Sequence, residues 1–238
     1  MTVQVLSDPE ALARAVARLL ADTMKIHPEG LYCMAAGDTP RRTYVHLATL
    51  LKREGFDPSR LRFVALDEWR GLGPDSPGGC RAFLREALFG PLGIGADQIA
   101  FFDALAPDPV EDCRRIDRWI ADHGPLTTAV LGIGMNGHLG FNEPGTPADS
   151  PTRPVDLDAT TQRVGAKYFP DGRVPVQGLT LGLDTLMKAC HVVVLATGSA
   201  KAGIARAARN PGLFPEVPAA VLNRHPDARL FIDAVAGV

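Results

Sequence analysis

The chain predicts an α/β fold in which helices cover both faces of a doubly wound, mostly parallel sheet. Apolar, β-branched runs alternate with amphipathic helical patterns along all 238 residues. The runs at 126–133 and 191–197 are almost continuously apolar, which is typical of strands buried on both faces. No repeat, low-complexity segment or shift in composition divides the chain, so residues 1–238 are predicted to form a single, modified Rossmann-like domain.

The predicted helices begin at recognisable start signals. Ser7-Asp8-Pro9-Glu10 combines a capping residue with a proline in the first turn, and it opens a helix over 9–25. Thr39-Pro40 opens a second helix over 40–54. Further helices are expected at 79–89, 111–122 and 178–189, from Ser199 onward, and in a short piece over 217–224.

The predicted strands are short apolar runs bounded by glycine, proline or polar residues. They are expected at 30–36, 61–66, 98–102, 126–133, 191–197 and 228–233. Residues 144–176 are rich in Pro, Asp, Thr and Gly and are predicted to be a weakly structured loop. A loop of that length inside a compact domain is often a lid or a binding segment.

Composition excludes several classes of function. The net charge is −2, with acids and bases spread throughout, so the sequence predicts no basic patch that would bind nucleic acid or an anionic membrane surface. No apolar run approaches the length of a membrane span, and the N-terminus lacks a secretory pattern. The four cysteines are scattered without metal-site spacing, so we expect no metal and a reducing, cytoplasmic location.

The most informative segment is LGIGMNGHLGFNEPG, residues 131–145. It follows the predicted strand 126–133 directly and carries His138 and Glu143 among five glycines. In open α/β sheets the ligand crevice lies outside the carboxyl ends of the strands, so this segment is predicted to be an active-site loop. A lone histidine in a glycine-rich turn is more often structural, but the combined string is far more specific than its parts.

Three further strand ends carry chemistry of the same kind. Gly37-Asp38-Thr39 opens a helix, and the free N–H groups and threonine hydroxyl there suit a phosphate. Asp67 follows an apolar strand, where partial desolvation raises a carboxyl pKa toward that of a useful general base. Lys201 lies in the first turn of a helix, a position the helix dipole disfavours unless an anion binds there.

Each of these three signals also has a structural interpretation. The first motif is equally well explained as a plain helix cap, Asp67 as a capping residue, and Lys201 as a surface lysine. Together with the His138 loop they predict a pocket for a small phosphorylated polar molecule, with acid–base chemistry and no metal. The glycines at 132, 134 and 137 lack dinucleotide-site spacing, and no nucleophile elbow is present.

At this point the chain resembles the glucosamine/galactosamine-6-phosphate deaminase (isomerase) family, which is related to the 6-phosphogluconolactonases. The string GHLGFNEPG (137–145) is highly specific, and its FNEP portion favours the deaminases over the lactonases. Matching motifs occur in the family's order across most of the chain, namely GDTP (37–40), LDEW (66–69), 131–145, LTLG (179–182) and GSAK (198–201).

The resemblance implies a cofactor-independent conversion of a 2-amino-2-deoxyhexose 6-phosphate to a ketohexose 6-phosphate with loss of ammonia. His138 would assist ring opening, Glu143 would orient it, and Asp67 would carry a proton between C2 and C1 of an enolamine. Asn136 would complete the catalytic group. The implied substrate-binding residues are Gly37, Asp38, Thr39, Gly137, Arg153, Lys167 and Lys201.

Three residues depart from the family's pattern. Asn136 stands where many members have aspartate; its side chain can accept a hydrogen bond from the imidazole but cannot stabilise an imidazolium by charge. Lys167 stands where the family carries an arginine, and a lysine cannot bind phosphate in the bidentate manner of a guanidinium. Asp38 is an unusual anion in a phosphate cradle.

The sequence is also compatible with two other functions, a 6-phosphogluconolactonase-type lactone hydrolase and a non-catalytic sugar-phosphate sensor. The substrate's configuration at C4 is also open, although LDEW, PGGC (77–80) and LDA (157–159) are closer to the galactosamine branch. The expected partner is a small phosphorylated amino sugar, with no nucleic acid, no membrane and no cofactor. The expected assembly is a monomer or a small homo-oligomer.

Overall fold

The computed structural model describes residues 1–169 and 172–237. Its main element is a seven-stranded sheet in which every pairing is parallel, which confirms the predicted doubly wound α/β architecture. In spatial order the strands are β1 (Thr2–Leu6), β10 (Ala228–Asp233), β9 (His191–Ala196), β6 (Leu126–Gly132), β2 (Leu31–Met34), β3 (Arg62–Ala65) and β5 (Ile99–Ala100).

The strand order reverses in the middle of this sheet. From β2 the chain proceeds through β3 to β5 at one edge, whereas β6, β9 and β10 lie on the other side of β2. Such a switch point opens a crevice beyond the carboxyl ends of the strands. Strands β9, β6, β2 and β3 are consecutive neighbours, so the four strand ends that carry the predicted site residues lie side by side.

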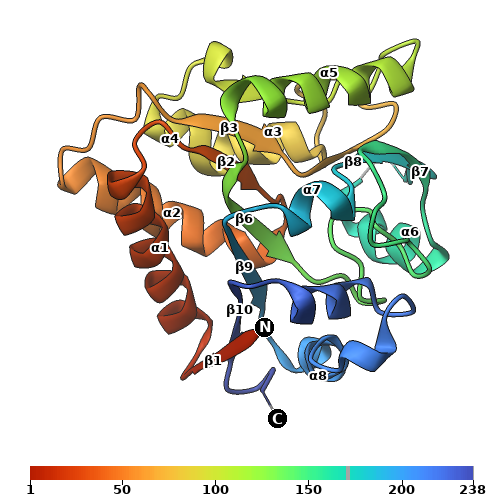
Figure 1. Ribbon diagram of the computed structural model, residues 1–238. Helices are drawn as coiled ribbons and strands as arrows, with labels where there is room; N and C mark the ends of the chain where they lie inside the picture. The colour runs from red at the N-terminus through yellow and green to blue at the C-terminus, as the bar shows by residue number, and fades with distance from the viewer. Residues whose placement is uncertain (170–171, 238) are drawn as a thin grey trace.

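Helices cover both faces of the sheet and enclose two cores (Figure 1). Alternate strand residues point to opposite cores, as the two-residue period of a strand requires: Tyr32 faces one and Cys33 the other. The first core packs against α1 (Pro9–Ile26), α2 (Asp38–Arg53), the π-helical η1 (Arg85–Phe89) and α4 (Gly90–Leu92). The second packs against α5 (Pro109–His123), α7 (Leu183–Met187), α8 (Ala202–Ala208) and the 3-10 helix η6 (Pro218–Arg224).

A second, antiparallel sheet of three strands lies beside the main one, in the order β4-β8-β7. It overturns two predictions, because the expected loop 144–176 contains a strand and helices, and the expected helix 178–189 begins as a strand. A short apolar run such as 177–180 fits either a helix or a strand. It forms a strand here because it pairs with β4 on one side and with β7 on the other. The elements concerned are β4 (Asp67–Trp69), β7 (Arg153–Asp156), α6 (Ala159–Gly165), η3 (Ala166–Tyr168) and β8 (Gln177–Thr180).

The other predicted helices and strands are present, with ends shifted by a few residues. Asp8 caps α1 by accepting the N–H of Ala11, as its capping motif predicts. Strand β1 was not predicted; it is a short edge strand, TVQVL, whose residues are largely exposed. The remaining elements are α3 (Cys80–Leu84), η2 (Ala96–Gln98), η4 (Ser199–Lys201) and η5 (Pro211–Leu213). Among the described helices, none is long and apolar enough to cross a membrane.

Candidate active site

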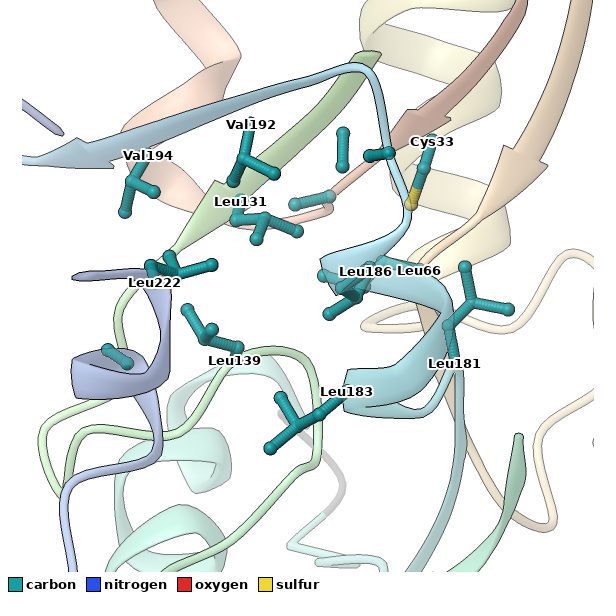
Figure 2. Close-up of a cluster of buried hydrophobic side chains, with 14 of the residues drawn as sticks. Cys33, Leu66, Leu131, Leu139, Leu181, Leu183, Leu186, Val192, Val194 and Leu222 are labelled. Atoms are coloured by element: carbon teal, nitrogen blue, oxygen red, sulfur yellow. The ribbon is translucent and has the colours of Figure 1, made fainter. Parts of the chain in front are cut away.

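The loop after β6 holds His138 in a fixed place. Its turn is closed by backbone hydrogen bonds from the Gly134 N–H to the His138 carbonyl and from the Gly137 N–H to the Gly134 carbonyl, both 3.0 Å. Figure 2 shows the next side chain, Leu139, pointing into the core beside Leu222. The buried Asn142 amide donates to the carbonyls of Leu139 and Leu181 at 2.8 Å. The loop therefore carries an anchored histidine.

The imidazole of His138 is oriented by two partners on its Nδ1 atom. Glu143 Oε2 lies 3.1 Å away and Thr161 Oγ1 lies 3.0 Å away. A proton on Nδ1 that is donated to the carboxylate leaves Nε2 of the neutral ring as the free base. The ring packs directly against Gly134, where an added Cβ would lie 2.2 Å from both Cδ2 and Nε2. Glycine at that position is a steric requirement of the ring's placement.

Glu143 is the centre of a small hydrogen-bond network. Burial alone would raise its pKa, but hydrogen bonds from His138, Thr161 and Asn136 hold the pKa below its ordinary value. The Asn136 amide donates to Glu143 Oε2 at 2.8 Å, and its carbonyl oxygen accepts the backbone N–H of His138 at 3.3 Å. Asn136 thus supports the carboxylate and the loop, and the imidazole makes its hydrogen bond to Glu143 rather than to Asn136.

Asp67 lies where the chain passes from β3 of the main sheet into β4 of the small sheet. Asp67 is buried, with only 8% of its surface exposed. Burial raises the pKa of Asp67 to about 7, and the neighbouring charge of Glu68 adds to this, while a hydrogen bond from the Cys80 thiol and the proximity of His138 oppose it. A carboxyl group with this pKa can both accept and return a proton near neutral pH.

The turns after β2 and β9 form the two sides of a cradle. Gly37 and Gly198 cap the helices that follow, with φ of 123° and 85°, and a Cβ on either would meet nothing within 4 Å. In the part of the chain that the structure describes, no side chain caps α2, so its first N–H groups, including that of Thr39, lack such a partner. This geometry suits an anion.

Lysine side chains lie on both sides of this cradle. Lys201 Nζ donates to the carbonyl of Ile133, the residue after β6, and burial together with the charge of Lys167 lowers the pKa of Lys201. Lys167 Nζ lies 2.6 Å from Asp38 Oδ2, and the Tyr168 hydroxyl lies 3.3 Å from the same oxygen. The unusual Asp38 is thus an exposed side chain that is paired with a lysine.

Gly137 and Arg153 have contacts of a different kind. Gly137 adopts a φ of 88°, and an added Cβ would lie 2.8 Å from Val217, so this glycine serves the tight turn beside His138. The Arg153 guanidinium donates to Asn142, Thr146 and the Pro151 carbonyl. These bonds fasten the loop behind the site, and none of them reaches the cradle.

Four residues around the site were not predicted. Thr161 and Asp158 lie in the segment that the sequence assigned to a loop; Asp158 caps α6 by accepting the Thr160 N–H at 2.7 Å. The signal that was available is the run LDATT, an aspartate cap followed by threonines. Glu68 and Cys80 are revealed only by the packing of α3 on β4. Within residues 1–169 and 172–237, no cluster of three or more potential metal ligands is found.

The fold and the site together define an α/β enzyme of the acid–base type, with a histidine–glutamate pair, a buried carboxyl group and an anion cradle at adjacent strand ends. A sequence model described as "Glucosamine-6-phosphate isomerases/6-phosphogluconolactonase" matches residues 7–231, and the chain belongs to this family. A glucosamine-6-phosphate deaminase of Bacillus pumilus is 34% identical over 238 residues, which cover 100% of this chain and 99% of the relative.

Solved structures agree with this assignment. A monomeric glucosamine-6-phosphate deaminase superposes with a TM-score of 0.96 at 32% identity, over 99% of this chain and 98% of that one. A 6-phosphogluconolactonase from Trypanosoma cruzi superposes with a TM-score of 0.76 at 20% identity, over 99% of this chain and 95% of that one. The second likeness shows a shared fold.

Proposed function

We propose that this protein is a glucosamine-6-phosphate deaminase, which converts glucosamine 6-phosphate and water to fructose 6-phosphate and ammonia without a cofactor. The observation that carries the proposal is a buried carboxyl group, Asp67, with a pKa of about 7, near an oriented histidine and an anion cradle. The full-length relatives named as glucosamine-6-phosphate deaminases support the same substrate.

Ring opening is assigned to His138 and Glu143. Nε2 of the neutral imidazole takes the proton of the anomeric hydroxyl and returns a proton to the ring oxygen as the C1–O5 bond breaks. Glu143 holds the Nδ1 proton and stabilises the positive charge that develops on the ring. Asn136 and Thr161 contribute by orienting these two groups.

The isomerisation is assigned to Asp67. Its carboxylate removes the proton from C2 of the open-chain amino sugar, the C–H electron pair forms the C1–C2 double bond, and the aldehyde oxygen O1 takes up a proton from water, which gives an enolamine. The carboxylic acid then returns a proton to C1, and the nitrogen lone pair forms the C2–N double bond of an iminium ion. Water adds to C2 and gives up one proton, and the C2–N bond of the resulting carbinolamine breaks as the C2 carbonyl forms, releasing ammonia and the ketose phosphate.

The phosphate is assigned to the cradle formed by Gly37, Thr39 and Lys201, with Lys167 on its rim. Helix N–H groups and a half-buried ammonium provide a partly desolvated, positively charged site for a dianion. The hydrogen bonds of Arg153 favour a structural role behind the site, and Gly137 is assigned to the turn that presents His138. Asp38 is assigned to the rim of the cradle, where it pairs with Lys167 before the phosphate binds.

We expect residues 1–238 to act as one domain and to form a monomer or small homo-oligomer. The similarity of a monomeric deaminase to 99% of this chain supports both expectations. We also expect a cytoplasmic location, with a phosphorylated amino sugar as the partner and neither nucleic acid nor membrane. The four cysteines are free thiols, which is compatible with a reducing compartment.

Release of ammonia tests the proposed function. Purified protein is mixed with glucosamine 6-phosphate and, separately, with galactosamine 6-phosphate, and ammonia is measured over time. We expect release from glucosamine 6-phosphate, and a fall of about 100- to 10,000-fold in kcat for His138→Ala. Absence of ammonia from both sugars, together with hydrolysis of 6-phosphogluconolactone, would replace the proposal with the lactonase function.

A further inference from the structure

Glu68 is a buried carboxylate whose hydrogen bonds the proposed reaction does not use. It follows Asp67 in β4 and is 5% exposed. One oxygen, Oε1, accepts the N–H groups of Trp69 at 2.9 Å and of Cys80 at 2.8 Å. The other, Oε2, accepts the N–H of Arg81 at 2.7 Å. Three short bonds from backbone donors make this a fully engaged carboxylate.

Two of these donors are the first N–H groups of α3. Gly79 stands at the cap position of this helix and has no side chain to offer, so the carboxylate of a distant strand serves as the cap. Glu68 thereby ties the start of α3 to the strand that carries Asp67. The residue fixed most directly by this connection is Cys80, the first residue of the helix.

The side chain of Cys80 lies near the catalytic carboxyl group. Cys80 is buried in a cluster with Trp69 and Phe141, and its thiol interacts with the carboxyl groups of both Asp67 and Glu68. The hydrogen bond from the thiol to Asp67 stabilises the ionised form of Asp67 and so lowers its pKa against the opposing effect of burial. The position of the thiol therefore affects how readily Asp67 accepts a proton.

We propose that Glu68 is a positioning residue that anchors the N-terminus of α3 so that the Cys80 thiol lies against the carboxylate of Asp67. This inference rests on the proposed function for its assignment of Asp67 as the catalytic base. Neither residue touches the substrate in this account, since both lie behind the carboxyl group. Cys80 acts on Asp67 through its thiol, and Glu68 acts on Cys80 through the backbone N–H and through its own interaction with that thiol.

Other ionisable groups also interact with Asp67: Cys33 in β2, Tyr44 in α2 and His138 in the loop after β6. None of them is altered in the variants described below. Arg81 is the cation that interacts with Glu68. The variants must therefore alter the anchor or the thiol while the negative charge at position 68 is kept.

The test is the titration of the Asp67 carboxyl group in ligand-free protein, followed by NMR with carboxyl-labelled aspartate and assigned with Asp67→Asn. Cys80→Ala removes the donor and is expected to move the midpoint of Asp67 upward by about one pH unit. Cys80→Ser retains a donor and should stay near the wild-type midpoint. Glu68→Asp keeps the charge but is one methylene too short to reach both helix N–H groups, so it should move the midpoint upward as Cys80→Ala does.

Combining the two changes isolates the connection between them. Because Glu68 is proposed to act through Cys80, the double variant should show the shift of Cys80→Ala alone. The acidic limb of kcat/KM should follow the same order among the variants.

An unchanged midpoint in Cys80→Ala would overturn the proposal even if Glu68→Asp failed to fold, and so would additive shifts in the double variant. The titration needs no turnover. Ordered midpoints in a protein that releases no ammonia would thus refute the deaminase and leave the positioning intact.

Discussion

Replacement of Asp67 by asparagine should make the protein more stable at alkaline pH while it destroys activity. Burial raises the pKa of Asp67 from 3.8 to about 7 in the folded state. A raised carboxyl pKa favours the protonated folded form, so stability is fully present below pH 3.8 and is lost as the pH rises through 7. At about 1.4 kcal/mol per pH unit, the folded protein loses about 4 kcal/mol in ionising this group.

The asparagine variant has no group to ionise at this position. The difference in free energy of unfolding between Asp67→Asn and wild type should therefore grow with pH, by about 2 to 3 kcal/mol between pH 5 and pH 8. Urea unfolding at a series of pH values measures it. Asp67→Ala should give the same slope with a different offset, because any packing cost is independent of pH. A difference that stays flat across this range would refute the burial argument for Asp67.

Three further predictions concern the histidine and the cradle. Gly134→Ala places a Cβ against the His138 ring, so kcat should fall at least about tenfold while the thermal unfolding midpoint changes little; unchanged kcat would contradict the steric argument. Lys201→Ala should raise KM for the sugar phosphate about tenfold or more, and inhibition by inorganic phosphate should weaken in parallel. Asp38→Asn releases Lys167 and removes an anion from the rim, so KM should fall about two- to fivefold, a modest effect because the pair is exposed; a rise in KM would assign Asp38 a binding role.

The main sheet and the convergence of the site could be predicted from the sequence because both depend on local patterns. Buried parallel strands are continuous apolar runs, and the residues that follow them must meet at one edge of the sheet. Asp67 and His138 were predicted in this way, and the strands that precede them lie on either side of β2.

The small sheet could not be predicted by the same reasoning. Strand β8 is a four-residue run whose pattern fits a helix equally well, and its state is decided by partners far away in the chain. The misassigned segment contains α6, so Thr161, which contacts His138, was missed with it. The hydrogen bonds of Glu68 could not be predicted for a related reason. Its partners, the N–H groups of residues 80 and 81, become its neighbours only when α3 packs on β4.

The most direct test of the account is to measure ammonia and fructose 6-phosphate in the same reactions with glucosamine 6-phosphate, for wild type and Asp67→Asn. Wild type should release equal amounts of both products and the variant neither, and the fold of the variant is verified by its unfolding curve. Ammonia release by Asp67→Asn within tenfold of wild type would contradict the account, because the proton at C2 would then be moved by another group.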